Sequence, residues 1–191
     1  STADAAFANG ISTHALDFDD SLVSLRGHPS ATVAPVVLAV GEAAGSSGTS
    51  VLAAYALGLE VAGKVGRALG QQHYMRGWHT TATVGVFSAT AAAARLWGLN
   101  AEQLQVAFGL AASQAAGLLR NFGTMTKPFH AGHAAHNGVL AAWMAAHGFT
   151  ADTTIFDGKE GFLFAYGGAD AERPVDLVAV LGKPWEVLEP G

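Results

Sequence analysis

Histidines and acidic residues gather at four places in the sequence, and each place combines side chains that can move protons or hold an anion. The first is the segment His14-Ala-Leu-Asp17-Phe-Asp19-Asp20-Ser21. On a helix, His14 and Asp17 share a face at i, i+3, and Asp17 and Ser21 share one at i, i+4. An acid beside a histidine orients the ring and raises its basicity, so the segment suits acid–base chemistry. A solvated acidic helix end is the alternative interpretation.

Two further histidines each stand directly before an expected helix start. In the segment Gly27–Ser30, a proline follows His28 and keeps it extended. Free backbone N–H groups at such a helix start favour anions. In the segment Gly77–Thr81, His79 adjoins a tryptophan at another helix start, which suits a carboxylate pocket. Both segments are also compatible with structural roles: a capping loop in the first, and a threonine cap with the tryptophan packed beneath it in the second.

The most specific of the four places is the segment 121–136, with the sequence NFGTMTKPFHAGHAAH. Lys127 precedes a proline in a Gly/Thr-rich loop, and its compact charge can bind a carboxylate or stabilise negative charge that develops on one. His130, His133 and His136 follow at three-residue spacing. A zinc site is not favoured, because residues at i, i+3 and i+6 point in progressively different directions around a helix and no fourth ligand is evident. His133 and His136 are better explained as packing or interface histidines.

Other catalytic motifs are not found in the sequence. No Gly-rich turn follows a predicted strand, so neither a P-loop nor a dinucleotide loop is predicted. The nucleophile elbow of serine hydrolases is also missing. The chain has no cysteine, which excludes disulfides, thiolate zinc sites and cysteine nucleophiles.

The apolar residues that must position these groups recur at three- and four-residue intervals, which predicts helices rather than strands. The clearest case is Val51–Leu69, where a polar stripe of Glu60, Lys64 and Arg67 runs along an otherwise apolar and largely buried helix. The other predicted elements are helices at Ala3–Asp17, Val33–Ala44, Thr80–Trp97, Ala101–Ala112, Gly132–Ala146 and Lys159–Tyr166, and an extended tail at Asp170–Gly191. The predicted fold class is therefore all-α, a bundle-like arrangement of several helices in one domain.

Several ends of these helices are marked by residue type. Pro35 suits a first turn, where its missing N–H is not needed. Gly98 and Gly148 can end helices in the left-handed conformation. Asn100 followed by Gln103 is typical of a capping box.

Composition narrows the classes of partner. The chain of 191 residues has 10 basic and 15 acidic residues, which argues against a nucleic-acid partner but leaves a local basic pocket for a small anion open. The longest uncharged stretches, 80–94 and 103–119, fall short of the roughly 20 strongly apolar residues of a membrane helix. No secretory signal stands at the N-terminus. We therefore expect a soluble, cytoplasmic protein with no nucleic-acid or membrane partner.

At the four places described above, the sequence resembles the MmgE/PrpD family. The resemblance is carried, in the family's order, by His14-Ala-Leu-Asp17-Phe-Asp-Asp, Gly27-His28-Pro-Ser, Gly77-Trp-His79 and Phe122-Gly-Thr-Met-Thr-Lys127-Pro-Phe-His130-Ala-Gly-His133. It covers nearly the whole chain. It implies a dehydratase, decarboxylase or epimerase that acts on small di- or tricarboxylates without a metal or cofactor. It also implies a homodimer that forms through the helical domain.

The resemblance assigns roles to individual residues. The active-site positions of the family correspond here to Asp17, Ser21, His28, His79 and Lys127. Ser21 replaces a threonine of the family and keeps its hydroxyl, and the spacing from Asp17 to His28 is one residue longer. Either His79 or His28 is expected to act as base or acid, while Lys127 and the other histidine hold carboxylates. Asp17 is expected to orient the cluster, and Ser21 and His130 to bind substrate.

The same resemblance sets an expectation for domain organisation. Members of the family are more than twice as long and combine a large helical domain with a smaller α+β lid. Residues 1–191 are therefore expected to form part of the helical domain, without its N-terminal helices, the C-terminal lid and a further catalytic histidine of that later region. Three interpretations stay open: a lyase or isomerase, a truncated and catalytically incomplete helical scaffold for dimerisation, and a histidine-rich metal module.

Overall fold

The structure is a computed structural model of the whole chain, and it describes residues 1–168, 171 and 174–188. The first helices are α1 (Thr2–His14), α2 (Pro29–Ala43), α3 (Gly48–Met75), α4 (Thr80–Thr83), α5 (Gly85–Trp97) and α6 (Ala101–Ala112). A 3-10 turn at Leu119–Asn121 leads into α7 (Thr126–Ala146), α8 (Phe162–Gly167), α9 (Pro174–Ala179) and a last 3-10 turn at Glu186–Leu188. No strand occurs among the described residues, and the predicted all-α fold class is confirmed.

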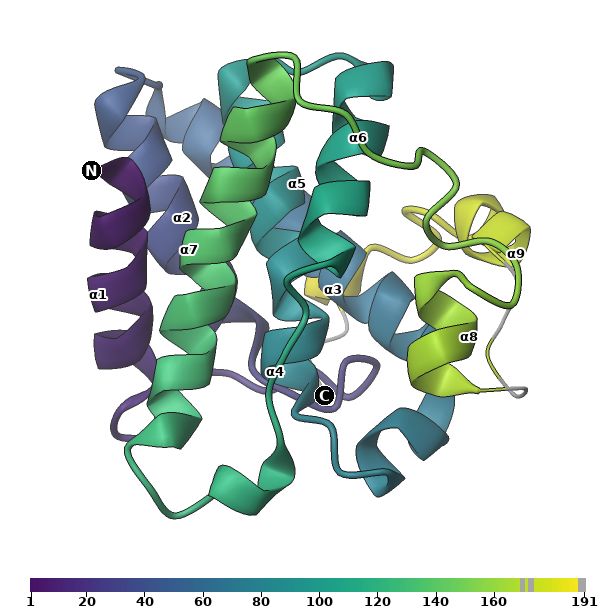
Figure 1. Cartoon of the computed structure of the whole chain (residues 1–191). Helices are drawn as coiled ribbons and strands as arrows, with labels where there is room; N and C mark the ends of the chain where they lie inside the picture. The colour runs from purple at the N-terminus through teal and green to yellow at the C-terminus, as the bar shows by residue number, and fades with distance from the viewer. Residues whose placement is uncertain (169–170, 172–173, 189–191) are drawn as a thin grey trace.

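The helices form a bundle in which α7 lies against α1, α2, α5 and α6, while α3 packs on α2 and α5. Figure 1 shows α1, α7 and α6 side by side at the front, with α8 and α9 at one flank. Two clusters of buried residues hold the bundle together, one around Phe87 between α3, α5 and α8, and one around Val36 between α2, α3 and α5. The end of α1 and the starts of α4 and α7 lie at the same end of the bundle, at the bottom of Figure 1.

Helices α1 and α7 meet backbone to backbone at a pair of glycines. A Cβ atom on Gly132 would lie 2.5 Å from the carbonyl oxygen of Phe7 and 2.6 Å from Cγ1 of Ile11. A Cβ atom on Gly10 would lie 2.8 Å from Cα of Gly132. These separations are too short for a methyl group, so both glycines are needed for the close approach that places the end of α1 beside the start of α7.

We expect Gly132→Ala to lower the free energy of unfolding by about 1–3 kcal/mol, because the added methyl group meets backbone that cannot rotate away. Gly48→Ala is the matched control. No atom lies within 4 Å of a Cβ at Gly48 and its φ is not positive, so alanine there should be neutral or stabilise by up to about 1 kcal/mol. Urea unfolding of the two variants measures the difference. Equal stability of both variants would contradict the close approach of α1 and α7.

Some predicted helix ends are confirmed and others are wrong. Helix α6 has the predicted bounds and its capping box, in which Asn100 Oδ1 accepts from the Gln103 backbone N–H at 2.9 Å. Helix α1 ends at His14 rather than at Asp17, and Asp17 lies beyond the helix with a left-handed φ of 58°. Helix α7 begins at Thr126 rather than at Gly132. Pro128 therefore lies in its first turn, where no backbone N–H is required.

The remaining helix bounds also differ in detail. Helix α2 begins at Pro29, so Pro35 lies inside the helix and not in its first turn. The predicted helix Thr80–Trp97 is divided at Val84 into α4 and α5. The predicted helix Val51–Leu69 is part of the longer α3, which contains one non-helical residue, Gly70.

The C-terminal part of the chain is less extended than predicted. Helix α8 begins at Phe162, three residues after the predicted start at Lys159. Within the predicted extended tail, Pro174–Ala179 is helical and Glu186–Leu188 forms a 3-10 turn. Residues 170, 172–173 and 189–191 of that predicted tail lie outside the described residues.

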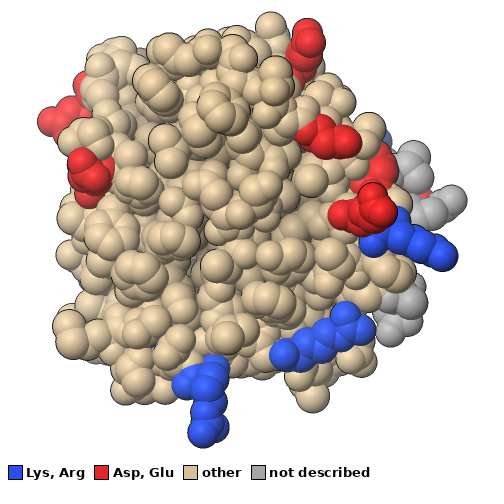
Figure 2. Space-filling view, viewed as in Figure 1, with Lys and Arg blue, Asp and Glu red and all other residues tan. Residues whose placement is uncertain are grey.

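The surface carries few charged side chains over its front helices. Figure 2 shows that the face presented by α1, α7 and α6 is almost free of Lys, Arg, Asp and Glu. Phe129 and Trp143 of α7 are 40% and 49% exposed. Such a face is what the homodimer inferred from the family resemblance would need, and the homodimer stays a prediction. None of the helices among the described residues combines the length and the apolarity needed to cross a membrane.

Candidate active site

The chemistry-bearing residues lie at the end of the bundle where α1 stops and α2, α4 and α7 start. The loop 15–28 crosses this end of the bundle and carries Asp17, Asp19 and Asp20. Gly66 of α3 allows the loop to pack directly against the helix backbone, because a Cβ at this position would lie 2.7 Å from Cα of Leu25. A hydrogen bond of 2.7 Å from the Thr80 hydroxyl to the carbonyl oxygen of Arg26 ties the same loop to α4.

Lys127 and Asp17 form an ion pair across this end of the bundle. The Lys127 ammonium donates to Asp17 Oδ1 at 2.6 Å. Its carbon chain is largely enclosed, and the ammonium lies 5.1 Å from the centre of the Phe122 ring. The hydrogen bond from Lys127 holds the pKa of the Asp17 carboxyl below its usual range. An ammonium has three N–H donors, so Lys127 can hold Asp17 and still donate to a bound carboxylate.

His28 lies next to the same carboxylate with a defined tautomer. Its Nδ1 is 2.9 Å from the backbone carbonyl oxygen of Asp20, which can only accept a hydrogen bond. Nδ1 therefore carries the proton, and a neutral His28 has its lone pair on Nε2. That Nε2 lies 3.7 Å from Asp17 Oδ1. The His28 ring thus presents a proton acceptor beside the Asp17–Lys127 pair.

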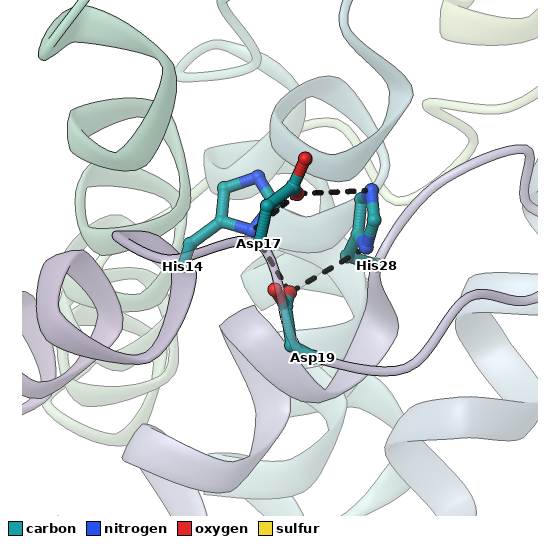
Figure 3. A group of neighbouring side chains, drawn as sticks. All are labelled: His14, Asp17, Asp19 and His28. Carbon is teal, nitrogen blue, oxygen red and sulfur yellow. Dashed lines mark hydrogen bonds and ion pairs between the residues drawn. The ribbon is translucent and has the colours of Figure 1, made fainter.

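Asp19 lies beneath the rings of His14 and His28 (Figure 3). Its Oδ2 is 2.8 Å from His14 Nδ1 and 3.6 Å from His28 Nδ1. Both Asp19 and His14 are almost completely buried, with exposed side-chain fractions of 4% and 0%. Burial lowers the pKa of His14, although the charge and hydrogen bond of Asp19 raise it. Nε2 of His14 and Oδ1 of Asp19 are buried without a hydrogen-bond partner.

His79 and His130 form a second, adjoining pair. Their Nδ1 atoms are 3.0 Å apart, so one ring donates and the other accepts. Phe122 packs edge-on against His79, with ring centres 4.8 Å apart. The His14 ring is nearly parallel to that of His79 at a centre distance of 5.9 Å, and it therefore connects the two groups of residues. Nε2 of His79 is also buried without a partner.

Ser21 is set slightly apart from the ion pair. Its exposed side chain lines an open depression of about 390 Å³ together with His28 and Arg26. Arg26 has a left-handed φ of 55° and is exposed. A substrate that reaches from Lys127 over His28 toward this depression would find a hydroxyl and a second cation there.

One group of side chains in the described part of the chain has the spacing of a metal site. His14, Asp17, Asp19 and His28 each offer a ligand atom, and these atoms lie within 4.8 Å of one another. The Lys127 ammonium already donates to the Asp17 carboxylate of this group, and a metal ion bound there would be repelled by that positive charge. The nitrogens of the helical histidines point elsewhere: His133 and His136 both contact Asn137.

Two buried rings near this end are expected to make the fold acid-sensitive. Burial lowers the pKa of His79 to about 3 and that of His73 to about 4, below the ordinary value near 6.5. As the pH falls below about 6.5, the unfolded chain takes up protons on these residues before the folded chain does. The free energy of unfolding should therefore fall with pH down to about 4, by up to about 1.4 kcal/mol per pH unit for each ring.

Urea unfolding between pH 7 and pH 4.5 measures this dependence. In a His73→Asn variant, the slope of the free energy of unfolding against pH should be smaller by the contribution of one histidine, up to about 1.4 kcal/mol per pH unit. His73 donates from Nδ1 to the carbonyl oxygen of Tyr166 and accepts at Nε2 from the Thr83 hydroxyl, so its neutral form is held on both sides. An unchanged slope in the variant would contradict burial of a neutral His73.

The structure brings together most of the residues predicted from the sequence. Asp17, His28 and Lys127 converge directly, and His79 pairs with His130. Ser21 reaches the group only through its shared depression with His28. Two positions were predicted wrongly in detail: Lys127 lies in the first turn of α7 rather than in a loop, and Asp17 lies beyond α1 rather than on the same helical face as His14.

Sequence reasoning missed roles for three residues of this end. Asp19 was part of the acidic segment, but its five-residue spacing from His14 is not a helical neighbour distance. Phe122 was part of the quoted motif without a role, although it contacts both His79 and Lys127. Arg26 stands alone in the sequence, and no motif marked it.

Comparison with known proteins gives consistent matches. The model of the MmgE/PrpD N-terminal domain matches residues 1–173. The chain is 35% identical over 163 residues to human cis-aconitate decarboxylase, which covers 83% of this chain and 34% of that protein. It is 34% identical over 186 residues to the mouse cis-aconitate decarboxylase, and 30% identical over 196 residues to that of Aspergillus terreus. These matches cover 95% and 96% of this chain, and 37% and 40% of the two relatives. The chain thus spans between a third and two fifths of the length of these relatives.

Proposed function

The chain belongs to the MmgE/PrpD family, and we propose that it supplies the helical part of an active site for a lyase that acts on small polycarboxylates. The observation that carries the proposal is the convergence of a lysine, an acid and histidines at one end of the bundle. Lys127, Asp17 and His28 lie there within one another's reach. A cation for a carboxylate and a proton acceptor are the two groups that such chemistry requires.

The chemistry sets clear demands on these groups. Removal of a proton or of CO2 next to a carboxylate leaves an electron pair on the adjacent carbon, and this charge spreads into the neighbouring carboxylate. A cation that contacts the carboxylate stabilises the transition state more than the ground state, because the charge grows during the reaction. Lys127 is placed for this role. A histidine then takes the proton that leaves, or delivers the one that replaces CO2.

His28 is the better-placed histidine for accepting a proton from bound substrate. Its Nε2 lone pair follows from the hydrogen bond between Nδ1 and Asp20, and its side chain is 24% exposed. His79 is buried, and burial lowers its pKa to about 3, so a neutral ring is present at neutral pH. In the proposed arrangement His79, held by His130, binds a carboxylate or delivers a proton, while Asp17 keeps Lys127 and His28 in place.

The named relatives favour cis-aconitate as the first substrate to test, because three decarboxylases of that name match nearly the whole chain or most of it. Dehydration and epimerisation use the same groups and differ in which bond breaks and where a proton returns. We propose that none of these reactions needs a metal ion here, since Lys127 already supplies the cation. Turnover should therefore persist in the presence of EDTA.

The second candidate function is a catalytically incomplete scaffold that serves dimerisation. The uncharged face of α1, α7 and α6 favours it (Figure 2). A thermal-shift series with citrate, cis-aconitate and chloride at equal ionic strength separates the two candidates. An active-site domain should be stabilised by the polycarboxylates beyond the salt effect, whereas a scaffold should respond to ionic strength alone.

The direct test is proton NMR in D2O of the full-length gene product with cis-aconitate, 2-methylcitrate and iminodisuccinate in separate samples. Loss of CO2, loss of water, or exchange of a C–H proton identifies the reaction. Turnover of one substrate supports the lyase or isomerase function and names it. No change in any of the three, together with no polycarboxylate-specific thermal shift, would favour the scaffold.

A further inference from the structure

We propose that His14 is a further catalytic residue of this site and that Asp19 is the positioning residue that orients it. The proposal rests on the polycarboxylate function described above and deepens it. In this arrangement Asp19 fixes the proton of His14 on Nδ1, and the Nε2 lone pair contacts the bound substrate and exchanges a proton with it.

The tautomer of His14 follows from its single hydrogen bond. A carboxylate can only accept, so the 2.8 Å contact between Asp19 Oδ2 and His14 Nδ1 places the proton on Nδ1. His14 is 1% exposed, and burial is the largest cause of its lowered pKa. The neutral ring therefore carries a free lone pair on Nε2, which is the form that a general base needs.

The unpartnered Nε2 is difficult to explain by packing alone. A buried nitrogen without a hydrogen bond costs about 1–3 kcal/mol, and an apolar side chain would fill the position at the end of α1 without this cost. Asp19 Oδ1 is a second buried atom without a partner. Two such atoms in one hydrogen-bonded pair indicate that the pair serves a ligand or reaction rather than the core.

The surroundings of His14 place it inside the candidate site. Its ring centre lies 4.8 Å from that of His28 and 5.9 Å from that of His79. Figure 3 shows Asp19 on one side of the rings of His14 and His28, next to their Nδ1 atoms. The Asp17 oxygen that Lys127 contacts lies 3.9 Å from Nδ1 of His14 and 3.7 Å from Nε2 of His28. A substrate carboxylate held by Lys127 would therefore lie beside the His14 ring, whose Nε2 has no hydrogen-bond partner among the described residues.

The charge of Asp19 also tunes the ring. Its charge and hydrogen bond raise the pKa of His14 against the effect of burial, while the charges of His28 and Lys127 lower it. The charged and titratable groups that interact with His14 come from every element packed around it. They are Asp17 and Asp19 of the loop, His28 before α2, His79 before α4, and Lys127 and His130 on α7. Removal of the Asp19 charge should thus move the protonation of His14 to lower pH.

Two replacements of His14 separate its two nitrogens in the full-length gene product. In His14→Asn, the amide nitrogen replaces Nδ1 and keeps the bond to Asp19, but nothing replaces Nε2. In His14→Gln, a group stands near the position of Nε2 but cannot exchange a proton. We expect both variants to lose turnover by at least about a hundredfold. His14→Asn should keep its thermal midpoint, and a folded His14→Asn with near wild-type turnover would overturn the proposal.

Asp19→Asn tests the positioning role through the pH profile of kcat/KM, which would not shift if Asp19 were only structural. We expect the acid limb of the pH profile of kcat/KM to shift to lower pH, because the charge that raises the pKa of His14 is gone. An unshifted limb in a folded Asp19→Asn variant contradicts the role of Asp19. The expected loss of kcat is smaller than in the His14 variants, since the base itself remains.

Nitrogen-15 NMR of histidine-labelled wild-type protein gives a result that depends on neither turnover nor the folding of variants. The free protein should show a His14 ring with a proton on Nδ1 and none on Nε2. Saturation with cis-aconitate should shift the Nε2 resonance. If no substrate is turned over but Nε2 shifts, the proposed reaction fails and the His14 contact stands. Two results would overturn the contact even in an active enzyme: an Nε2 that carries a proton in the free protein, or an Nε2 chemical shift that does not change when cis-aconitate is added.

Discussion

Replacement of Lys127 by methionine in the full-length gene product is expected to lower turnover by at least about a hundredfold while the fold persists. Loss of one group that stabilises developing negative charge costs about 10²–10³ in kcat, and Lys127 is the cation that contacts the Asp17–His28 group. The fold should persist because the side chain makes one described hydrogen bond, to an Asp17 carboxylate that is 54% exposed. Exposed ion pairs of this kind contribute about 0–1 kcal/mol.

The measurement is steady-state turnover of the substrate found by NMR, with circular dichroism to follow the fold. Lys159→Met is the matched control, because Lys159 is an exposed lysine in a loop away from the site and should leave turnover unchanged. Lys127→Arg keeps the charge but replaces a compact ammonium by a planar fork, so we expect partial activity. Near wild-type turnover of Lys127→Met would remove this residue from the mechanism, and with it the main support for the proposed function.

The elements of the fold were predictable because helix periodicity and capping are local properties. Helix α6, from its Asn100 cap to Ala112, has the bounds that the sequence indicated. Errors arose where tertiary contacts decide the backbone. The left-handed φ of Asp17 is not a local preference of the segment HALDFDD; it accompanies the contact of Asp17 with Lys127, 110 residues away. Pro128 suggested a loop but occupies the first turn of α7.

The residues of the candidate site were selected mainly through the family resemblance. Spacing on a helix could pair His14 with Asp17, yet the short hydrogen bond of His14 goes to Asp19 at 2.8 Å. No periodic rule joins residues five apart across a helix end. The pair of His79 and His130 joins two helix starts that are 51 residues apart, and no spacing rule indicates such a contact. Residue types thus indicated the chemistry, whereas the partners of each ring depend on how the loop crosses the bundle.

The polar stripe on α3 illustrates the same limit and leads to the second large effect. Glu60 and Lys64 belong to the polar stripe predicted on this helix, but both side chains are buried, with 1% and 3% exposed. The segment 182–188 covers them. Glu60 accepts hydrogen bonds from the backbone N–H groups of Gly182 and Glu186, and Lys64 donates to Glu186 Oε1 at 2.9 Å. Ser24 of the loop 15–28 donates to the other oxygen of Glu186 at 2.6 Å, so this cluster ties that loop to α3.

Replacement of Lys64 by methionine is expected to lower the free energy of unfolding by about 3–5 kcal/mol, because it leaves the Glu60 and Glu186 carboxylates buried without their central cation. Arg67 contacts Glu186 at 3.2 Å but is half exposed, so it replaces the lost charge only in part. Urea unfolding at pH 7 measures the effect. Lys159→Met serves again as the control, with an expected change within about 0.5 kcal/mol. A loss below 1 kcal/mol in Lys64→Met would mean that the cluster is not a buried charge network.

The pH dependence of that loss distinguishes an unpaired charge from a lost packing contact. In the wild-type chain, burial raises the pKa of Glu186. The hydrogen bonds from Lys64 and Ser24 and the charges of Lys64 and Arg67 lower it by more, so the net pKa lies below its usual value. A carboxyl group with a lowered folded pKa stabilises the fold above its unfolded pKa and loses that contribution as the pH falls. Without Lys64, burial dominates, and protonation of Glu186 should favour the folded variant at lower pH. The stability difference between wild type and Lys64→Met should therefore narrow from pH 7 to pH 5. A difference that stays constant over this range would indicate lost packing, because the contacts of a methylene chain do not titrate.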